Sequence, residues 1–194
     1  MTLHFYKGYS QVRIWMDEPL PPAFIGDTRW TTTLPAASPA SSTPRSAGVE
    51  IYFITEPRTV YAAIGGAFTP NPNATQTLVQ VEATDTYAGD DNLPWVDALA
   101  RGLDTVRVGI YREYLRGVEG GLRVASERGL LQAGALRLNR GAQGELGSSV
   151  MAFAGATFLL LCVLWKWEHL EIIAEVDLMW QLMVGGDFLR VIGE

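Results

Sequence analysis

The sequence predicts an α/β domain of the α+β type, and three features of the chain lead to this fold class. Strand-like runs follow one another closely between residues 49 and 82. An amphipathic helix is expected over Tyr111–Arg128, and a second, uncharged helix is expected from Ser148 to about Trp165. With 194 residues, of which 48% are hydrophobic, the chain is long enough to bury the core of one domain.

The first 48 residues are expected to lie outside this domain. Only Gln11–Met16 has the pattern of a short strand, and the prolines that follow it are incompatible with regular structure. Residues 34–48 are rich in proline and serine, which indicates a flexible linker or a long loop. We therefore expect the compact domain to span residues 49–165 and residues 166–194 to form an apolar C-terminal extension.

Three segments of the expected domain carry strand signals. Val49–Ile54 and Thr59–Phe68 are extended candidates rich in β-branched and aromatic residues, and Thr77–Glu82 alternates as a half-buried strand should. Thr69–Asn73 is a turn by composition, because proline fixes φ and asparagine tolerates left-handed backbone geometry. Together these segments predict an antiparallel hairpin.

The helix over Tyr111–Arg128 has the clearest pattern in the chain. Its apolar residues recur at spacings of three and four and fall on one face, whereas arginines and glutamates occupy the other face. Gly129 supplies the stop, since glycine most easily adopts the left-handed conformation that ends a helix. The apolar face consists of Leu115, Val118, Leu122 and Ala125.

A short strand is expected at Ala135–Asn139 and a loop at Arg140–Gly144. Ser148 is a natural N-cap for the next helix, because its hydroxyl can accept from an exposed backbone N–H. The uncharged run Val150–Trp165 is shorter than the roughly twenty residues of a bilayer span, so we expect a buried core helix and no membrane span. His169–Met183 keeps an apolar pattern that fits either a continued helix or a strand followed by a helix.

Charge is unevenly distributed along the chain. The net charge of −6 argues against a dedicated nucleic-acid binder on overall electrostatics. Residues 101–140, however, contain eight arginines against four acidic residues. Such a cluster on an acidic body predicts a docking face for an anionic partner, and the alternative is an ordinary solvated helix surface.

Reactive side chains are scarce: the chain has one cysteine, Cys162, and two histidines, His4 and His169. No catalytic set, metal site or cofactor motif is expected from so few groups, and Cys162 in its apolar run is expected to be a buried thiol. The acidic groupings, at Asp90–Asp91 and at Glu168, Glu171 and Glu175, are expected to be solvated. A lone cysteine and the lack of a secretory signal favour a cytoplasmic location.

Three stretches resemble the fourth domain of bacterial elongation factor G and of the tetracycline-resistance ribosomal protection proteins. The first is Trp95–Gly102 followed by the helix that begins Tyr111-Arg-Glu-Tyr, which resembles the family's "R-E-Y-I-x-x-V-E-x-G" helix entry. The second is Ala125–Leu131, and the third is Ser148-Ser-Val-Met-Ala-Phe153, which is similar to an "S-S-x-x-A-F" helix start. The resemblance covers roughly residues 50–165 and implies a ribosomal protein S5 domain 2-like fold, a mixed and mostly antiparallel sheet with two helices on one face.

This resemblance implies a module that acts in translation and contacts the ribosome, RNA or a protein partner. The family's GTPase domain and its G-x-x-x-x-G-K-[ST] motif are absent, and the tip loops differ, so no GTP hydrolysis and no enzymatic activity are expected. The contact surface is expected to neutralise phosphates. Its candidate residues are Arg112, Arg116, Arg123, Arg137 and Arg140.

Two alternatives belong to other functional classes. Gly144-Glu-Leu-Gly-Ser-Ser149 resembles the phosphate loop of the galactokinase, homoserine kinase and mevalonate kinase superfamily, which makes Gly144, Gly147, Ser148 and Ser149 candidate phosphate ligands. The competing interpretation of this loop is a helix cap with small residues for close packing. The other alternative is a structural subunit that forms a homo-oligomer through its apolar C-terminal segment.

Overall fold

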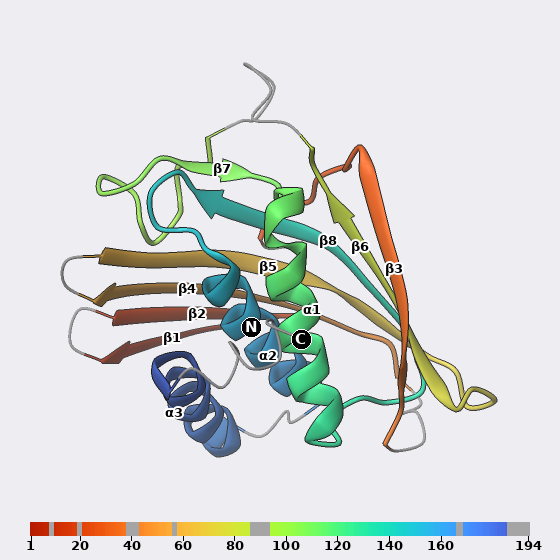
Figure 1. The fold of residues 1–194 in the computed structure, drawn as a ribbon. Coiled ribbons are helices and arrows are strands. Elements are labelled where there is room, and N and C mark those ends of the chain that lie inside the picture. The colour runs from red at the N-terminus through yellow and green to blue at the C-terminus, as the bar shows by residue number, and fades with distance from the viewer. Residues whose placement is uncertain are drawn as a thin grey trace.

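In the part of the chain that the structure describes, one mixed sheet of eight strands carries three helices on one face (Figure 1). The computed structural model describes residues 1–7, 10–18, 21–37, 43–55, 58–85, 94–165 and 169–185. The strands are β1 (Thr2–Lys7), β2 (Ser10–Met16), β3 (Thr28–Pro35), β4 (Arg45–Thr55), β5 (Arg58–Pro70), β6 (Gln76–Ala83), β7 (Val106–Val108) and β8 (Gly134–Gly144). The helices are α1 (Leu115–Glu127), which follows the 3₁₀ turn η1 (Arg112–Tyr114), α2 (Val150–Trp165) and α3 (His169–Gly185). The predicted α+β class is confirmed.

The strand order is β1-β2-β4-β5-β8-β6-β3, with β7 paired to the end of β8. All pairs are antiparallel except β6 with β8, which are connected through α1 and run parallel. The hairpin between β4 and β5 is confirmed, and so is the turn after β5, where Asn71 Oδ1 accepts from the Asn73 N–H at 3.1 Å. The third predicted strand, β6, does not pair with β5, because β8 lies between β5 and β6. The alternation of apolar and polar residues shows which residues of a strand share a face, but it does not show which strand is its neighbour in the sheet.

The expected boundary at Val49 falls inside β4, and the N-terminal segment belongs to the sheet. β2 pairs along β4 from Gln11↔Tyr52 to Met16↔Ala47, and β3 pairs with β6 at the opposite edge of the sheet. The period-two pattern of β2 buries Val12, Ile14 and Met16 in the main core. The predicted separate segment is therefore wrong for these strands, while residues 38–42 of the predicted linker lie outside the described residues.

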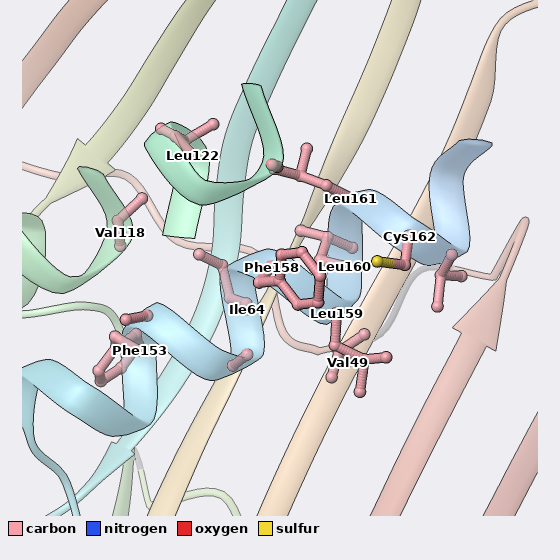
Figure 2. Packing of buried hydrophobic residues seen from close by; sticks show 14 of the residues in the cluster. Val49, Ile64, Val118, Leu122, Phe153, Phe158, Leu159, Leu160, Leu161 and Cys162 are labelled. Carbon is pink, nitrogen blue, oxygen red and sulfur yellow. The ribbon is translucent and has the colours of Figure 1, made fainter. Parts of the chain in front are cut away.

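α2 is the centre of the helix layer. It lies between α1 and α3 and packs on β4 and β5, and every residue from Ala152 to Leu164 is buried. A helix that is apolar on all sides must be enclosed on all sides, which explains the uncharged run. Figure 2 shows its side chains between Val118 and Leu122 of α1 and Val49 and Ile64 of the sheet. No helix in the described ranges combines the length and apolarity needed to cross a membrane.

α1 confirms the predicted amphipathic helix. Val118, Leu122 and Ala125 are buried in the core, Leu115 packs against it, and Gly129 ends the helix with a φ of +68°. The first turn is a 3₁₀ turn, so the α-helix proper begins later than predicted. The polar side of α1 remains open to solvent.

Within the described part of the C-terminal segment, α3 is one continuous helix that packs on the same core. Met179 and Leu182 of α3 are buried, and the Trp180 ring lies 4.7 Å from the Phe53 ring of β4. Glu175 was expected to be solvated with Glu168 and Glu171, but it is 7% exposed and accepts from the buried Cys162 thiol at 3.4 Å. Lys166 to Glu168 and the pair Asp90–Asp91 lie outside the described residues, as does the side chain of Glu171. Intramolecular packing accounts for the apolar residues Met179 and Leu182 of α3, and self-association stays a prediction.

A second, smaller core covers the opposite face of the sheet. Tyr52, Tyr61, Ala63 and Ala142 meet Ala98, Ala100 and Val106, which belong to the segment that crosses this face. The predicted loop at Arg140–Gly144 is wrong, because β8 continues through it and pairs with β5 and β7. Its small residues serve packing: a Cβ at Gly141 would lie 2.7 Å from a carbon of Ile110 and 2.8 Å from the Ala63 carbonyl oxygen.

Candidate functional site

Three of the five candidate arginines share the outer surface of η1 and α1. Arg112, Arg116 and Arg123 are all exposed, because the opposite side of α1 is buried against α2. The Arg112 guanidinium lies 3.3 Å from Asp85, and that of Arg123 lies 2.8 Å from Glu119 one helical turn away. Surface pairs of this kind are worth little, about 0–1 kcal/mol, so a phosphate can compete for these arginines.

The other two candidates lie on the opposite face of the sheet. Leu136 and Leu138 of β8 point into the main core, so Arg137 between them points away from the helices. Arg137 lies 3.4 Å from Glu82, and Arg140 donates to the Pro21 carbonyl oxygen at 3.2 Å. Both arginines line one groove on this face. Grouping all five arginines into one surface was therefore wrong, because closeness in sequence does not override the alternation of a strand.

Both serines of the Gly144–Ser149 loop have structural partners. The Ser148 hydroxyl accepts from the Gly144 N–H at 2.9 Å and donates to the Tyr61 carbonyl oxygen at 2.9 Å. Ser149, and not Ser148 as predicted, caps α2: its hydroxyl accepts from the Ala152 N–H at 3.1 Å. Ser148 instead fastens the loop to β5, while Ser149 has the spacing that an N-cap requires.

The backbone donors of this loop are occupied by a carboxylate of the same chain. Asp104 accepts from the Gly147 N–H at 2.8 Å and from the Leu146 N–H at 3.1 Å. A Cβ at Gly144 would overlap the Asp104 carboxylate, and one at Gly147 would lie 3.2 Å from it. The glycines thus make room for Asp104, and this geometry favours a closed structural turn over a phosphate site.

Asp104→Ala is expected to lower the free energy of unfolding by about 1–3 kcal/mol, because it leaves two backbone N–H groups without their acceptor. Urea unfolding measures this loss. Asp97→Ala is the matched control, since Asp97 is exposed and its carboxylate accepts no hydrogen bond from the residues that the structure describes. Equal stability of the two variants, or thermal stabilisation of the wild-type protein by ATP and Mg²⁺, would contradict this interpretation of the loop.

A buried ion pair on the second core escaped the sequence analysis. Glu50 of β4 is 0% exposed, and one of its oxygens accepts from Arg13 Nε of β2 at 2.9 Å. The other oxygen accepts from the Tyr61 hydroxyl at 2.9 Å and from the Leu99 N–H at 2.7 Å. Arg13 also donates to the Asp97 carbonyl oxygen at 2.7 Å. The pair therefore ties residues 97–99 to the sheet.

Burial dominates the ionisation of this cluster. It raises the pKa of Glu50, an effect that the Arg13 charge and the hydrogen bonds partly offset. Burial and the adjacent Glu50 charge raise the pKa of Tyr61 well above its ordinary value. Because Glu50 is fully enclosed, it cannot reach a substrate, and its role is to hold Arg13 in place. A charged residue between apolar neighbours was the only sequence signal, and solvent-facing strand positions show the same pattern.

A comparison with models of protein families, with curated proteins and with solved structures found no match. The resemblance to the fourth domain of elongation factor G therefore rests on the three stretches of sequence alone.

Proposed function

We propose that this chain is a non-enzymatic module of the elongation factor G domain IV type that binds RNA through Arg112, Arg116 and Arg123. The fold part of this proposal is supported by the mixed sheet with α1 and α2 packed side by side on one face. It is also supported by the positions of two of the resembling stretches, which form the starts of α1 and α2.

The observation that carries the proposal is the exposure of these three arginine side chains on one side of η1 and α1. The Arg112 side chain is 67% exposed and that of Arg123 is 44% exposed, although the inner side of α1 is buried. Arg116 and Arg123 are seven positions apart, which places them about 10 Å apart along the helix axis, on the same side. Guanidinium groups held at such spacing suit successive phosphates, and they position a nucleic acid without reading its bases.

The overall charge of −6 affects how the proposed RNA binding depends on salt concentration. A polyanion is repelled by the body of the protein and attracted by one surface, so affinity must depend strongly on salt. Asp85 and Glu119, the acids paired with Arg112 and Arg123, release their partners at small cost, because both pairs lie at the solvent-exposed surface.

Neutralising Arg112, Arg116 and Arg123 to glutamine is expected to weaken binding to ribosomal RNA at least tenfold. The slope of log affinity against log salt should fall by about two, since up to three phosphate contacts are lost. Filter binding at several salt concentrations measures both quantities, and ribosome co-sedimentation extends them to the intact particle.

The matched control is the triple variant Arg58→Gln, Arg101→Gln and Arg137→Gln, which removes the same charge from exposed arginines outside α1. It should leave both affinity and slope nearly unchanged. An equal loss of RNA affinity in the two triple variants would show that net charge, and not the position of the arginines, causes the effect. Ribosome binding that is insensitive to salt would point to a protein partner instead of RNA.

A further inference from the structure

A cavity of about 460 Å³ opens on the sheet face opposite the helices. Its floor is β2, whose residues Gln11, Arg13 and Trp15 alternate with the core residues Val12 and Ile14. Its wall is the segment from Trp95 to Arg101. The volume is within the range of small-molecule sites, so the question is what its lining would recognise.

Arg13 is a pre-organised donor at the floor of this cavity. Its Nε and Nη2 atoms are fixed by Glu50 and by the Asp97 carbonyl oxygen. Its guanidinium lies 4.7 Å from the centroid of the Trp15 ring and 5.5 Å from that of Trp95. The side chain is 15% exposed, and Nη1 has no hydrogen-bond partner among the described residues. A ligand acceptor at Nη1 would thus find a donor that loses almost no further freedom on binding.

The cavity presents charges of both signs that are separated in space. Arg101 at the wall is exposed, and within the described ranges no ion pair involves it. Asp97 at the same wall is also exposed. Together with the Arg13–Glu50 pair, two positive and two negative groups balance to zero. A phosphate dianion or a simple cation would give the occupied cavity a net charge, whereas a ligand with one charge of each sign would keep the sum at zero.

We propose that this cavity binds a small zwitterion of the α-amino acid class. The ligand carboxylate accepts hydrogen bonds from Arg13 Nη1 and from the Arg101 guanidinium. The ligand ammonium group faces Asp97, and the ligand side chain packs against Trp95 and Leu99. This site is independent of the proposed RNA surface, because it lies on the other face of the sheet and shares no residue with it.

The test is a titration of the intrinsic tryptophan fluorescence, confirmed by calorimetry, with the standard amino acids. L-phenylalanine is compared with 3-phenylpropionate, which lacks the ammonium group, and with phenethylamine, which lacks the carboxylate. At least one amino acid should give saturable binding, with both truncated analogues of an aromatic ligand at least about tenfold weaker, the equivalent of one lost charge-assisted contact.

Two conservative variants assign the ends of the ligand, since both positions are exposed and outside the main core. Arg101→Gln should weaken amino-acid binding at least about tenfold, and Asp97→Asn should remove the preference for phenylalanine over 3-phenylpropionate. Arg58→Gln is the control and should bind as the wild-type protein does. The proposal is overturned if no amino acid binds, if an analogue that lacks the ammonium group or the carboxylate of a bound amino acid binds as tightly as that amino acid, or if Arg101→Gln has no effect.

Discussion

Gly117→Ala is expected to lower the free energy of unfolding by about 3 kcal/mol, at the upper end of what one extra methyl group costs in a packed core. A Cβ at this position would overlap the Val150 carbonyl oxygen at the start of α2. Gly121→Ala should have a similar effect, since its Cβ would lie 2.5 Å from the Ala154 carbonyl oxygen and 2.8 Å from Cβ of Thr157. These neighbours are mostly helix backbone, which cannot yield unless α1 and α2 move apart.

The sign of the effect is itself diagnostic. In an exposed helix, glycine to alanine stabilises by about 0.5–1 kcal/mol, because alanine has the higher helix propensity. A loss of stability therefore reports the contact between α1 and α2 and not the helix alone. Urea unfolding followed by circular dichroism measures it, and a gain in stability at Gly117 would show that the two helices do not approach so closely.

Gly155→Ala in α2 is the matched control. A Cβ there would meet Sδ and Cγ of Met183 at 2.5 and 3.0 Å and Sδ of Met179 at 3.2 Å, all of them atoms of flexible side chains. Methionine readily adopts another rotamer, so we expect a change within about 1 kcal/mol. If Gly155→Ala costs as much as Gly117→Ala, the rigidity of the α1–α2 contact is not the cause of the loss.

Local periodicity accounts for the elements that could be predicted. The apolar spacing from Leu115 to Ala125 and the uncharged run from Val150 to Trp165 each identify one helix, because helix formation depends on near neighbours in sequence. Strand candidates such as Val49–Ile54 were found for the same reason. The insertion of β8 between β5 and β6 depends on contacts between distant segments, which no local pattern contains.

The N-terminal strands illustrate a second limit. Proline and serine between residues 34 and 48 indicated a linker, yet β3 ends at Pro35 on the edge of the sheet, where a missing N–H is tolerated. The composition of residues 34–48 indicates a connecting segment, but it does not show that the chain before and after that segment forms strands of the same sheet.

The candidate sites also differ in how far the sequence predicts them. The exposure of Arg116 and Arg123 follows from the amphipathic pattern of their own helix. The pairing of Arg13 with Glu50 requires the register in which these residues lie opposite each other on β2 and β4. Before that register is known, two charged strand residues 37 positions apart give no reason to be paired.

Arg13→Met is expected to destabilise the protein by about 3–5 kcal/mol at neutral pH, because it leaves the Glu50 carboxylate buried without its cation. The double variant Arg13→Met, Glu50→Gln should recover most of this loss, since no buried charge then remains. Urea unfolding of the wild-type protein, both single variants and the double variant forms a complete cycle. If the double variant is as unstable as Arg13→Met alone, lost packing against Trp15 and Trp95 explains the effect instead of the charge.

The pH dependence separates these causes further. The pKa of Glu50 is raised by burial, so its protonated form fits the folded state better than its ionised form. Its contribution to stability is therefore complete below the unfolded pKa of about 4.3 and declines as the pH rises through the higher folded pKa. The free energy of unfolding of the wild-type protein minus that of Glu50→Gln should accordingly be larger at acidic pH than at neutral pH. In Arg13→Met the decline should extend to higher pH, because the cation that lowers the pKa of Glu50 has been removed. A difference between wild type and Glu50→Gln that grows with pH would mean that Glu50 is stabilised in its ionised form, and the burial argument would fail.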